Sequence, residues 1–291
     1  MTWERFGYIC RKAAASRLEG GSIAERLSQI EAEYACRLYG DPIKDRSWPR
    51  KILTDIQAMH NDQEAREAID TYQHLNLTQQ FAAPMRFKRV IAYLSLIVFV
   101  FYSMVTTYSV KVLPVFVDLF ETFGQSAPVH LLGFYQYAGT FVLVASLLLL
   151  FTLLLGHQLK KLFTFKVGIE NNFIIKYLVF PTIRNSYLKV LEILQFPLRN
   201  VQLRTENTIN ISDHSISDTL VSEHLREVKA ANMSVSKEMQ ELIEIEMRTL
   251  LASCEKQLKL LTILVAVTVL SAVGFFLVSA YSPIFMFGEF V

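Results

Sequence analysis

The uncharged stretch LLGFYQYAGTFVLVASLLLLFTLLLG at Leu131–Gly156 decides the fold, because it runs for 26 residues without Asp, Glu, Lys, Arg or His. Two similar stretches lie at Val90–Val110, with 21 residues, and at Leu260–Gly288, with 29 residues. A helix of about 20 apolar residues crosses the ~30 Å hydrocarbon core of a bilayer. The sequence therefore predicts three transmembrane helices.

The overall composition agrees with this prediction. Charged residues make up 19% of the chain, against roughly 25% in soluble domains, and the net charge of +2 gives no general footprint for nucleic acid. Cys10, Cys36 and Cys254 are too scattered for a disulfide framework or a zinc site. Since Met1–Arg89 is polar and mixed in charge, we expect no cleaved signal peptide. A soluble globular protein, a secreted disulfide scaffold and a disordered tail are excluded.

Basic residues near the ends of the three stretches predict the orientation in the membrane. Lys and Arg close to span ends are retained on the cytoplasmic side. Nine of them flank one side of the spans, and only Lys111 lies on the other. The nine are Arg86, Lys88, Arg89, Lys160, Lys161, Lys166, Arg248, Lys256 and Lys259. We therefore expect the N-terminus and residues 157–259 in the cytoplasm, and residues 111–130 and the C-terminus in the periplasm.

The fold class predicted from these patterns is all-α: a polytopic membrane protein with three transmembrane helices and two small cytoplasmic helical bundles. The bundles are expected at 1–89 and 157–259, and the spans at 90–110, 131–156 and 260–282. A short periplasmic loop with an amphipathic helix is expected at 111–130, and a periplasmic tail at 283–291.

Apolar residues at spacings of three and four predict the individual helices. Ser22 is placed to cap a helix whose apolar stripe comprises Ile23, Leu27, Ile30, Tyr34 and Leu38. Further helices are predicted from Trp48-Pro49, over Asp62–Gln80, between Pro181 and Pro197, and over Asp218–Ala231. The last helix begins at Val235 and continues through Gln257 into the third span without a breaker.

The sequence carries no recognisable catalytic pattern. No P-loop, nucleophile elbow or H-E-x-x-H motif occurs, and the spans lack the ionisable groups that pumps and intramembrane hydrolases need. Two sets of side chains resemble cation sites: the acidic face Asp62, Glu64, Glu67 and Asp70, and the pair His214 and His224. We interpret both sets as solvated polar faces. We predict no catalytic residue, no metal site and no cofactor, and a protein that is not an enzyme.

A family pattern surrounds the first span and returns near the C-terminus. A basic residue, an apolar stretch ending in Tyr and a later Pro occur here as Arg86, Tyr93 and Pro114. Phe116 and Gly124 follow in an amphipathic segment, and Pro283 stands in Ser282-Pro283-Ile284-Phe285. In this pattern the chain resembles the bacterial type II secretion system F family, which includes the inner-membrane platform proteins of type IV pili. It departs from the family at Leu94, where the family has a first Pro.

The resemblance implies a function without chemistry. A member of this family would be a homo-oligomeric platform in the bacterial inner membrane. It would couple a cytoplasmic assembly ATPase to the polymerisation of pilin or pseudopilin, beside other inner-membrane assembly proteins. Lys88, Arg89, Lys160 and Lys161 are the candidate contacts for the ATPase, and the same charges serve to set topology. The residues leave a second function open: a membrane subunit of an oligomeric channel or of an ATPase-energised transporter.

Overall fold

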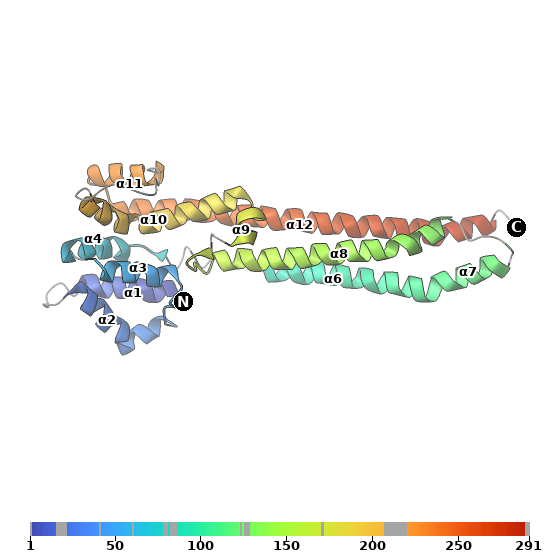
Figure 1. Ribbon diagram of the computed structural model, residues 1–291, viewed down its shortest axis with the longest axis horizontal. Helices are drawn as coiled ribbons and strands as arrows, with labels where there is room; N and C mark the ends of the chain where they lie inside the picture. Colours follow the sequence, from blue (N-terminus) through green and yellow to red (C-terminus); the bar gives the residue numbers. More distant parts are fainter. Residues whose placement is uncertain are drawn as a thin grey trace. The chain divides into compact units, whose positions relative to one another are not determined.

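The computed structural model describes residues 2–15, 22–40, 42–59, 61–77, 81, 87–122, 124, 129–169, 172–206 and 220–288 (Figure 1). Within these ranges the regular structure is helical, apart from one isolated β-bridge between Ser47 and Lys166. The expected all-α class is confirmed. Contacts divide the chain into two compact units, which we call the polar unit (Met1–Met85 with Gln158–Cys254) and the apolar unit (Arg86–His157 with Glu255–Val291).

The polar unit combines the two segments that the sequence assigns to two bundles. Its N-terminal helices are α1 (Thr2–Ala15), α2 (Ile23–Ala32), the 3-10 helix η1 (Tyr34–Tyr39), α3 (Trp48–Gln57) and α4 (Asp62–Gln73). The later helices are α9 (Phe173–Tyr177), α10 (Pro181–Glu206), α11 (Leu220–Ala230) and the first part of α12 (Val235–Gly288). Helix α1 packs on α2 and α4, while α10 packs on α3, α4 and α11. The two segments therefore share one interior.

The apolar stripe predicted for α2 is correct only in its first half. The Ser22 hydroxyl accepts the backbone N–H of Glu25 at 3.3 Å, as expected for an N-cap, and Ile23, Leu27 and Ile30 are buried. The extension to Tyr34 and Leu38 is wrong, because both are nearly 80% exposed, at 77% and 79%. Helix α2 ends at extended Glu33, and a 3-10 helix with a repeat of three residues follows. Because the helical repeat changes there, residues after Glu33 no longer point to the same side as Ile23, Leu27 and Ile30.

Other helix boundaries depart from the sequence expectation around proline. The predicted end at Pro197 is wrong, because α10 continues through Pro197 to Glu206. Proline removes one helical hydrogen bond and crowds the preceding turn. The neighbouring side chains Leu194, Phe196 and Leu198 are all buried, so their packing holds the helix together. The predicted start at Trp48-Pro49 and the break before Val235 are confirmed, the latter with Asn232 in the left-handed region at φ 56°.

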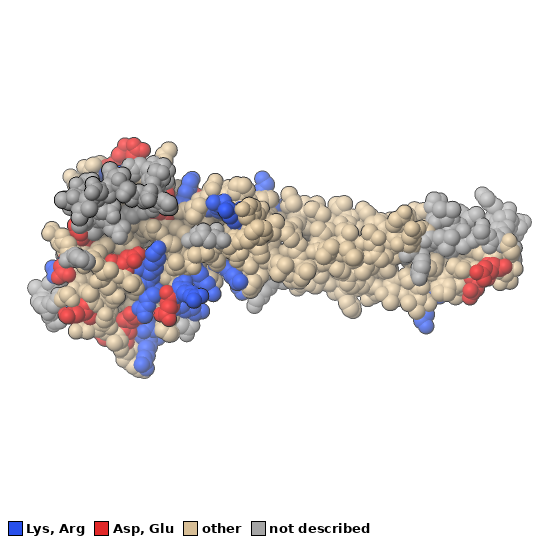
Figure 2. Space-filling view, in the orientation of Figure 1, with Lys and Arg blue, Asp and Glu red and all other residues tan. Residues whose placement is uncertain are grey.

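The apolar unit contains helices long and apolar enough to cross a membrane. The candidate spans are Ala92–Thr122, Gln136–Leu162 and a window in Val235–Tyr281. The first is made of α6 (Phe87–Thr107), a π-helical turn η2 (Tyr108–Val112) and α7 (Leu113–Thr122), and the second lies in α8 (Val129–Leu162). Three candidate spans indicate a helical membrane protein. On the face drawn in Figure 2, charged side chains gather over the polar unit and are sparse over the apolar helices.

The π-helical turn before Pro114 has a local cause. Pro114 has no N–H to donate to the carbonyl of Val110, and its ring would crowd that turn. The backbone widens there, and the Leu113 N–H bonds to the carbonyl of Tyr108, five residues back. The predicted amphipathic segment is thus helical and continuous with the first span.

The three apolar helices share one core and expose a second apolar face. Leu94, Val98 and Phe101 of α6 cluster with Ala138 and Ala145 of α8 and with Val265 and Val269 of α12. Large side chains on the outer faces are more than half exposed, among them Leu96, Phe99, Leu147 and Leu270. Exposed apolar surface on this scale marks contact with a partner or with lipid. A bilayer would cover it.

Candidate functional site

The end of α8 is joined to the N-terminal helices by a short backbone clamp within the polar unit. The N–H of Trp48 donates to the carbonyl of Phe165 at 2.9 Å, and the N–H of Val167 donates to the carbonyl of Arg46 at 3.0 Å. Ser47 and Lys166 form the antiparallel bridge between them. Trp48 is the first residue of α3, so its N–H has no partner inside that helix. The carbonyl of Phe165 accepts this N–H instead.

Phe165 is the strained centre of this clamp. Its φ of 46° lies in the left-handed region, which costs a bulky residue about 1–3 kcal/mol. The side chain is fully buried, and its ring centroid lies 4.2 Å from Phe81, 5.6 Å from Tyr187 and 5.8 Å from Trp3. Ring contacts from both segments of the polar unit therefore hold the backbone in an unfavourable conformation.

A second buried contact joins α4 to α10. The hydroxyl of Tyr72 donates to the backbone carbonyl of Leu194, and the Tyr72 ring meets Phe6 edge to face at 5.6 Å. Burial raises the pKa of Tyr72 well above its usual value, with smaller contributions from Cys10 and Asp55. The hydroxyl therefore keeps its proton and remains a donor across the physiological pH range.

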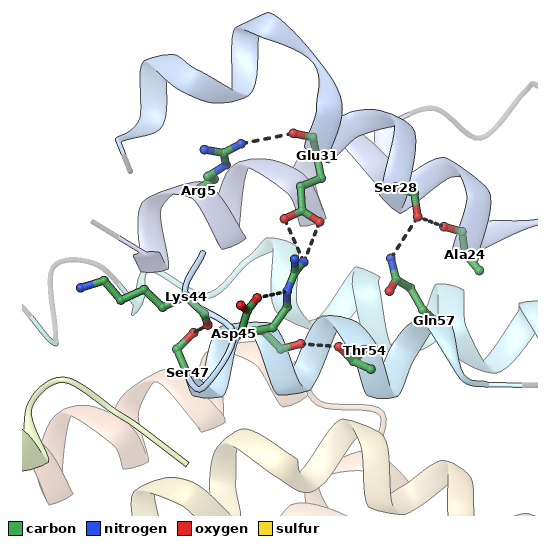
Figure 3. A network of polar contacts seen from close by, with 10 residues as sticks. Arg5, Ala24, Ser28, Glu31, Lys44, Asp45, Ser47, Thr54 and Gln57 are labelled. Carbon is green, nitrogen blue, oxygen red and sulfur yellow. Dashed lines mark hydrogen bonds and ion pairs between the residues drawn. The ribbon is translucent and has the colours of Figure 1, made fainter. Parts of the chain in front are cut away.

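A polar network connects α1, α2 and α3 at one side of the unit (Figure 3). One guanidinium nitrogen of Arg50 donates to both carboxylate oxygens of Glu31, at 2.8 and 2.9 Å, and Asp45 lies 3.8 Å from Arg50 Nε. Buried Arg5 donates to the backbone carbonyl of Glu31 at 3.2 Å. Glu31 therefore ties three helices together through both its side chain and its backbone.

The predicted contact residues fall in different parts of the chain. Lys160 and Lys161 occupy the last turn of α8, in the polar unit, where Lys160 is exposed and Lys161 is half-buried. Lys88 and Arg89 belong to the first turn of α6, in the apolar unit, and their side chains lie outside the described set, as does the whole of Arg86. That these four basic residues form one common surface therefore stays a prediction.

The family-motif residues that the structure describes, which exclude Arg86, are helical or turn residues of the apolar unit. Tyr93 is 58% exposed on α6, Pro114 and Phe116 lie in α7, and Gly124 forms a turn with φ 64°. Pro283 lies within α12, which runs to Gly288, and its side chain is outside the described set.

The two groups considered as cation sites are occupied by ordinary polar contacts where the structure describes them. Glu67 pairs with Lys229 of α11, and Asp70 accepts from the side-chain amide of Gln73 at 3.1 Å. His224 lies 2.8 Å from the carboxylate of Glu238, while His214 is outside the described residues. In the described part of the chain, no three His, Cys, Asp or Glu side chains are grouped to hold a metal.

One pocket of about 470 Å³ opens between α1, α2 and α4. Its described lining combines Ala13, Ala14, Ile23 and Ile69 with Arg26, Arg66 and Asp70. Two arginines and one aspartate thus lie beside apolar side chains, and Asp70 already accepts a hydrogen bond from Gln73.

Comparison with protein-family models, with curated proteins and with solved structures finds no match for this chain. The family resemblance at the first span therefore remains a prediction that rests on the motif residues themselves.

Sequence reasoning did not find the clamp around Phe165. Nothing in Thr164-Phe165-Lys166 marks a left-handed residue, because Gly or Asn is the usual signal and the nearby glycine is Gly168. The one usable sign was Trp48-Pro49, which fixed the start of α3 without revealing its partner. The contact is created by residues far apart in the sequence.

Proposed function

We propose that this chain is an inner-membrane platform protein of a bacterial type IV pilus or type II secretion machine. In this function it couples a cytoplasmic assembly ATPase to the polymerisation of pilin or pseudopilin, without catalysing a reaction itself. The N-terminus and the polar unit face the cytoplasm, the C-terminus faces the periplasm, and several copies assemble with other inner-membrane proteins beneath the fibre.

The observation that carries this proposal is the unbroken course of α12. The helix has 54 residues, a length of roughly 80 Å at 1.5 Å per residue. A stripe of buried residues follows it at spacings of three and four, through Met239, Ile243, Met247, Leu250, Cys254, Leu258, Leu261, Val265, Val269 and Ala272. A continuous helix that begins in a polar domain and ends in a candidate span suits the transfer of a displacement from the cytoplasm into the membrane.

The clamp around Phe165 adds a second route of the same kind. Helix α8 carries the second candidate span, and its last turns belong to the polar unit. The loop after α8 is bonded to the start of α3, so a movement of the N-terminal helices would reach α8 directly. The helices that carry two of the three candidate spans, α8 and α12, thus continue without a break into the polar unit.

The polar side chains of the spans favour a scaffold over the channel or transporter alternative. The hydroxyls of Ser103, Thr107, Thr152, Thr262 and Thr268 donate to carbonyls four residues back in their own helices, at 2.8–3.0 Å. Tyr102 and Ser146 form a hydrogen bond between α6 and α8. A bond to the carbonyl four residues back satisfies a hydroxyl within its own helix, and the bond between helices serves packing, so none of these groups requires a conduction path.

Affinity purification of the tagged full-length chain from cross-linked membranes of its own host tests this proposal. The expected partners are a P-loop ATPase and single-span proteins of the pilin class. Recovery of a solute-binding protein without either partner would contradict the platform function and support the transporter alternative.

A further inference from the structure

Helix α9 exposes a pair of aromatic side chains beside the end of a candidate span. Phe173 is 69% exposed and Tyr177 is 63% exposed, and their ring centroids lie 4.8 Å apart. Val167, in the loop before α9, and Leu178, directly after it, are also exposed, at 40% and 41%. We call these four residues the aromatic patch. Ile175, on the same short helix, is fully buried, so α9 is anchored by one side and presents the other outward.

The position of α9 is fixed by Asn172. The side chain of Asn172 caps α9 by accepting the N–H of Ile174 at 3.3 Å. Its amide nitrogen donates to the side-chain oxygen of Gln158 at 3.2 Å. Gln158 belongs to α8 and lies two residues after the uncharged stretch that ends at Gly156. When α8 crosses a bilayer with this 26-residue stretch in the ~30 Å hydrocarbon core, Gln158 and the neighbouring α9 come to the level of the lipid headgroups.

Charge around the patch matches an anionic lipid surface. The segment 157–178 contains Lys160, Lys161, Lys166 and Lys176 against one acidic residue, Glu170, so its charge is net positive. The ammonium of Lys176 lies 5.3 Å from the Tyr177 ring centroid, so one cation and one aromatic ring are presented together. Aromatic rings and lysines are the residues that anchor proteins at the membrane interface.

We propose that the aromatic patch inserts into the headgroup region of the leaflet that α8 enters, while the four lysines bind the phosphates of anionic phospholipids. The patch would fix the depth and tilt of α8 and the adjoining loop, which includes Phe165. This inference does not depend on the platform function, because it requires only that α8 spans a bilayer.

A second exposed apolar pair lies on η1, and it differs from the aromatic patch in its connection to the candidate spans. Tyr34 and Leu38 on η1 are more exposed than Phe173 and Tyr177. However, no described hydrogen bond joins η1 to a helix that contains a candidate span. Tyr34 therefore supplies a matched control, since it is the same residue type in the same unit and is more exposed than Tyr177.

The test uses full-length protein in vesicles of phosphatidylglycerol and phosphatidylcholine, with bromine on the acyl chains near the headgroup. Tyr177→Trp and Tyr34→Trp are made separately, and the wild-type signal of the buried Trp3 and Trp48 is subtracted. We expect the brominated lipid to quench most of the fluorescence that Tyr177→Trp adds and little of that from Tyr34→Trp. Replacing phosphatidylglycerol by phosphatidylcholine should reduce the quenching at position 177.

Two results would overturn the assignment. Equal quenching at the two positions would show that α9 has no special contact with lipid. Quenching at position 177 that is absent in dilute vesicles, together with a fluorescence change that depends on the protein-to-lipid ratio, would assign the patch to a second copy of the chain. Each outcome is independent of whether an ATPase is recovered.

Discussion

The polar and apolar units are both built from helices, but different contacts hold them together. In the polar unit, ring contacts and hydrogen bonds join residues far apart in the sequence, as in the Tyr72–Leu194 and Trp48–Phe165 bonds. In the apolar unit, several hydroxyls bond within their own helices, and large side chains such as Phe99 and Leu270 remain exposed. The polar unit buries its apolar side chains in its own interior, whereas the outward apolar side chains of the apolar unit need lipid to shield them from water.

The largest expected effect on stability is the loss of the Phe165 ring, which is compared with the loss of a ring in the apolar unit. Phe165→Ala should destabilise the polar unit by about 3–5 kcal/mol, because it removes the centre of a buried aromatic cluster. Phe99→Ala, at a position 67% exposed, removes an outward ring and should have a much smaller effect on folding. Urea unfolding of the purified full-length chain, followed by near-ultraviolet circular dichroism, measures both. Equal losses would mean that Phe165 is not the centre of a packed core.

The next effect concerns the helix that both units share. Ala252 is exposed on α12, so Ala252→Pro removes a hydrogen bond and crowds a turn, at ~3 kcal/mol or more, without deleting a buried side chain. The protein should still insert, since the candidate span is intact, but fibre assembly should fail. Ala252→Gly, at ~1 kcal/mol, is the matched control and should assemble normally. Normal assembly by a stably inserted Ala252→Pro chain would remove α12 from the coupling route.

Ion pairs provide a weaker test within the polar unit. Glu31→Gln should cost ~1–2 kcal/mol, because the half-buried pair with Arg50 loses a charge-assisted contact. Glu244→Gln breaks an exposed pair with Arg248 on one helix and should cost ~0.5 kcal/mol or less. Thermal unfolding at low and high salt separates them, since salt screens the exposed pair more strongly. A larger loss from Glu244→Gln would contradict the role of Glu31 as a tie between helices.

The smallest effect on the chain itself is expected from the lysines at the end of α8. Changing Lys160 and Lys161 together to Gln leaves Arg86, Lys88 and Arg89 to hold the orientation, so insertion should survive. If the two lysines contact an acidic ATPase surface, less ATPase should co-purify, and raising the salt should reduce the recovery of the wild-type complex further. Unchanged recovery at both salt concentrations would remove the ATPase contact and leave these lysines with topology and lipid binding.

Local signals predicted much of the fold. The Ser22 cap, the Trp48-Pro49 start and the unbroken helix from Val235 depend on neighbouring residues, and the structure bears them out. The length and apolarity of the spans likewise belong to continuous stretches. Local sequence was sufficient in each of these cases because the partners lie within a few turns.

Tertiary packing decided the rest. Pro197 continues a helix because the buried side chains beside it outweigh its local preference, and Phe165 takes a left-handed conformation because rings from distant segments hold it. The joining of residues 1–85 with 158–254 into one unit likewise depends on pairs that no short window of sequence contains. The aromatic patch was also missed, since its exposure is set by which side of α9 is anchored.

The central claim is that one polar unit, made of two chain segments, lies on a single side of the membrane while the end of α7 reaches the other. Single cysteines at Tyr34→Cys, Met233→Cys and Glu121→Cys test it with a membrane-impermeant maleimide in intact spheroplasts. The native cysteines are buried, and burial raises the pKa of Cys10 to about 12, so the wild-type chain should label weakly. We predict labelling of Glu121→Cys from outside, and of the other two only after lysis. External labelling of Met233→Cys, or protection of Glu121→Cys, would contradict the account.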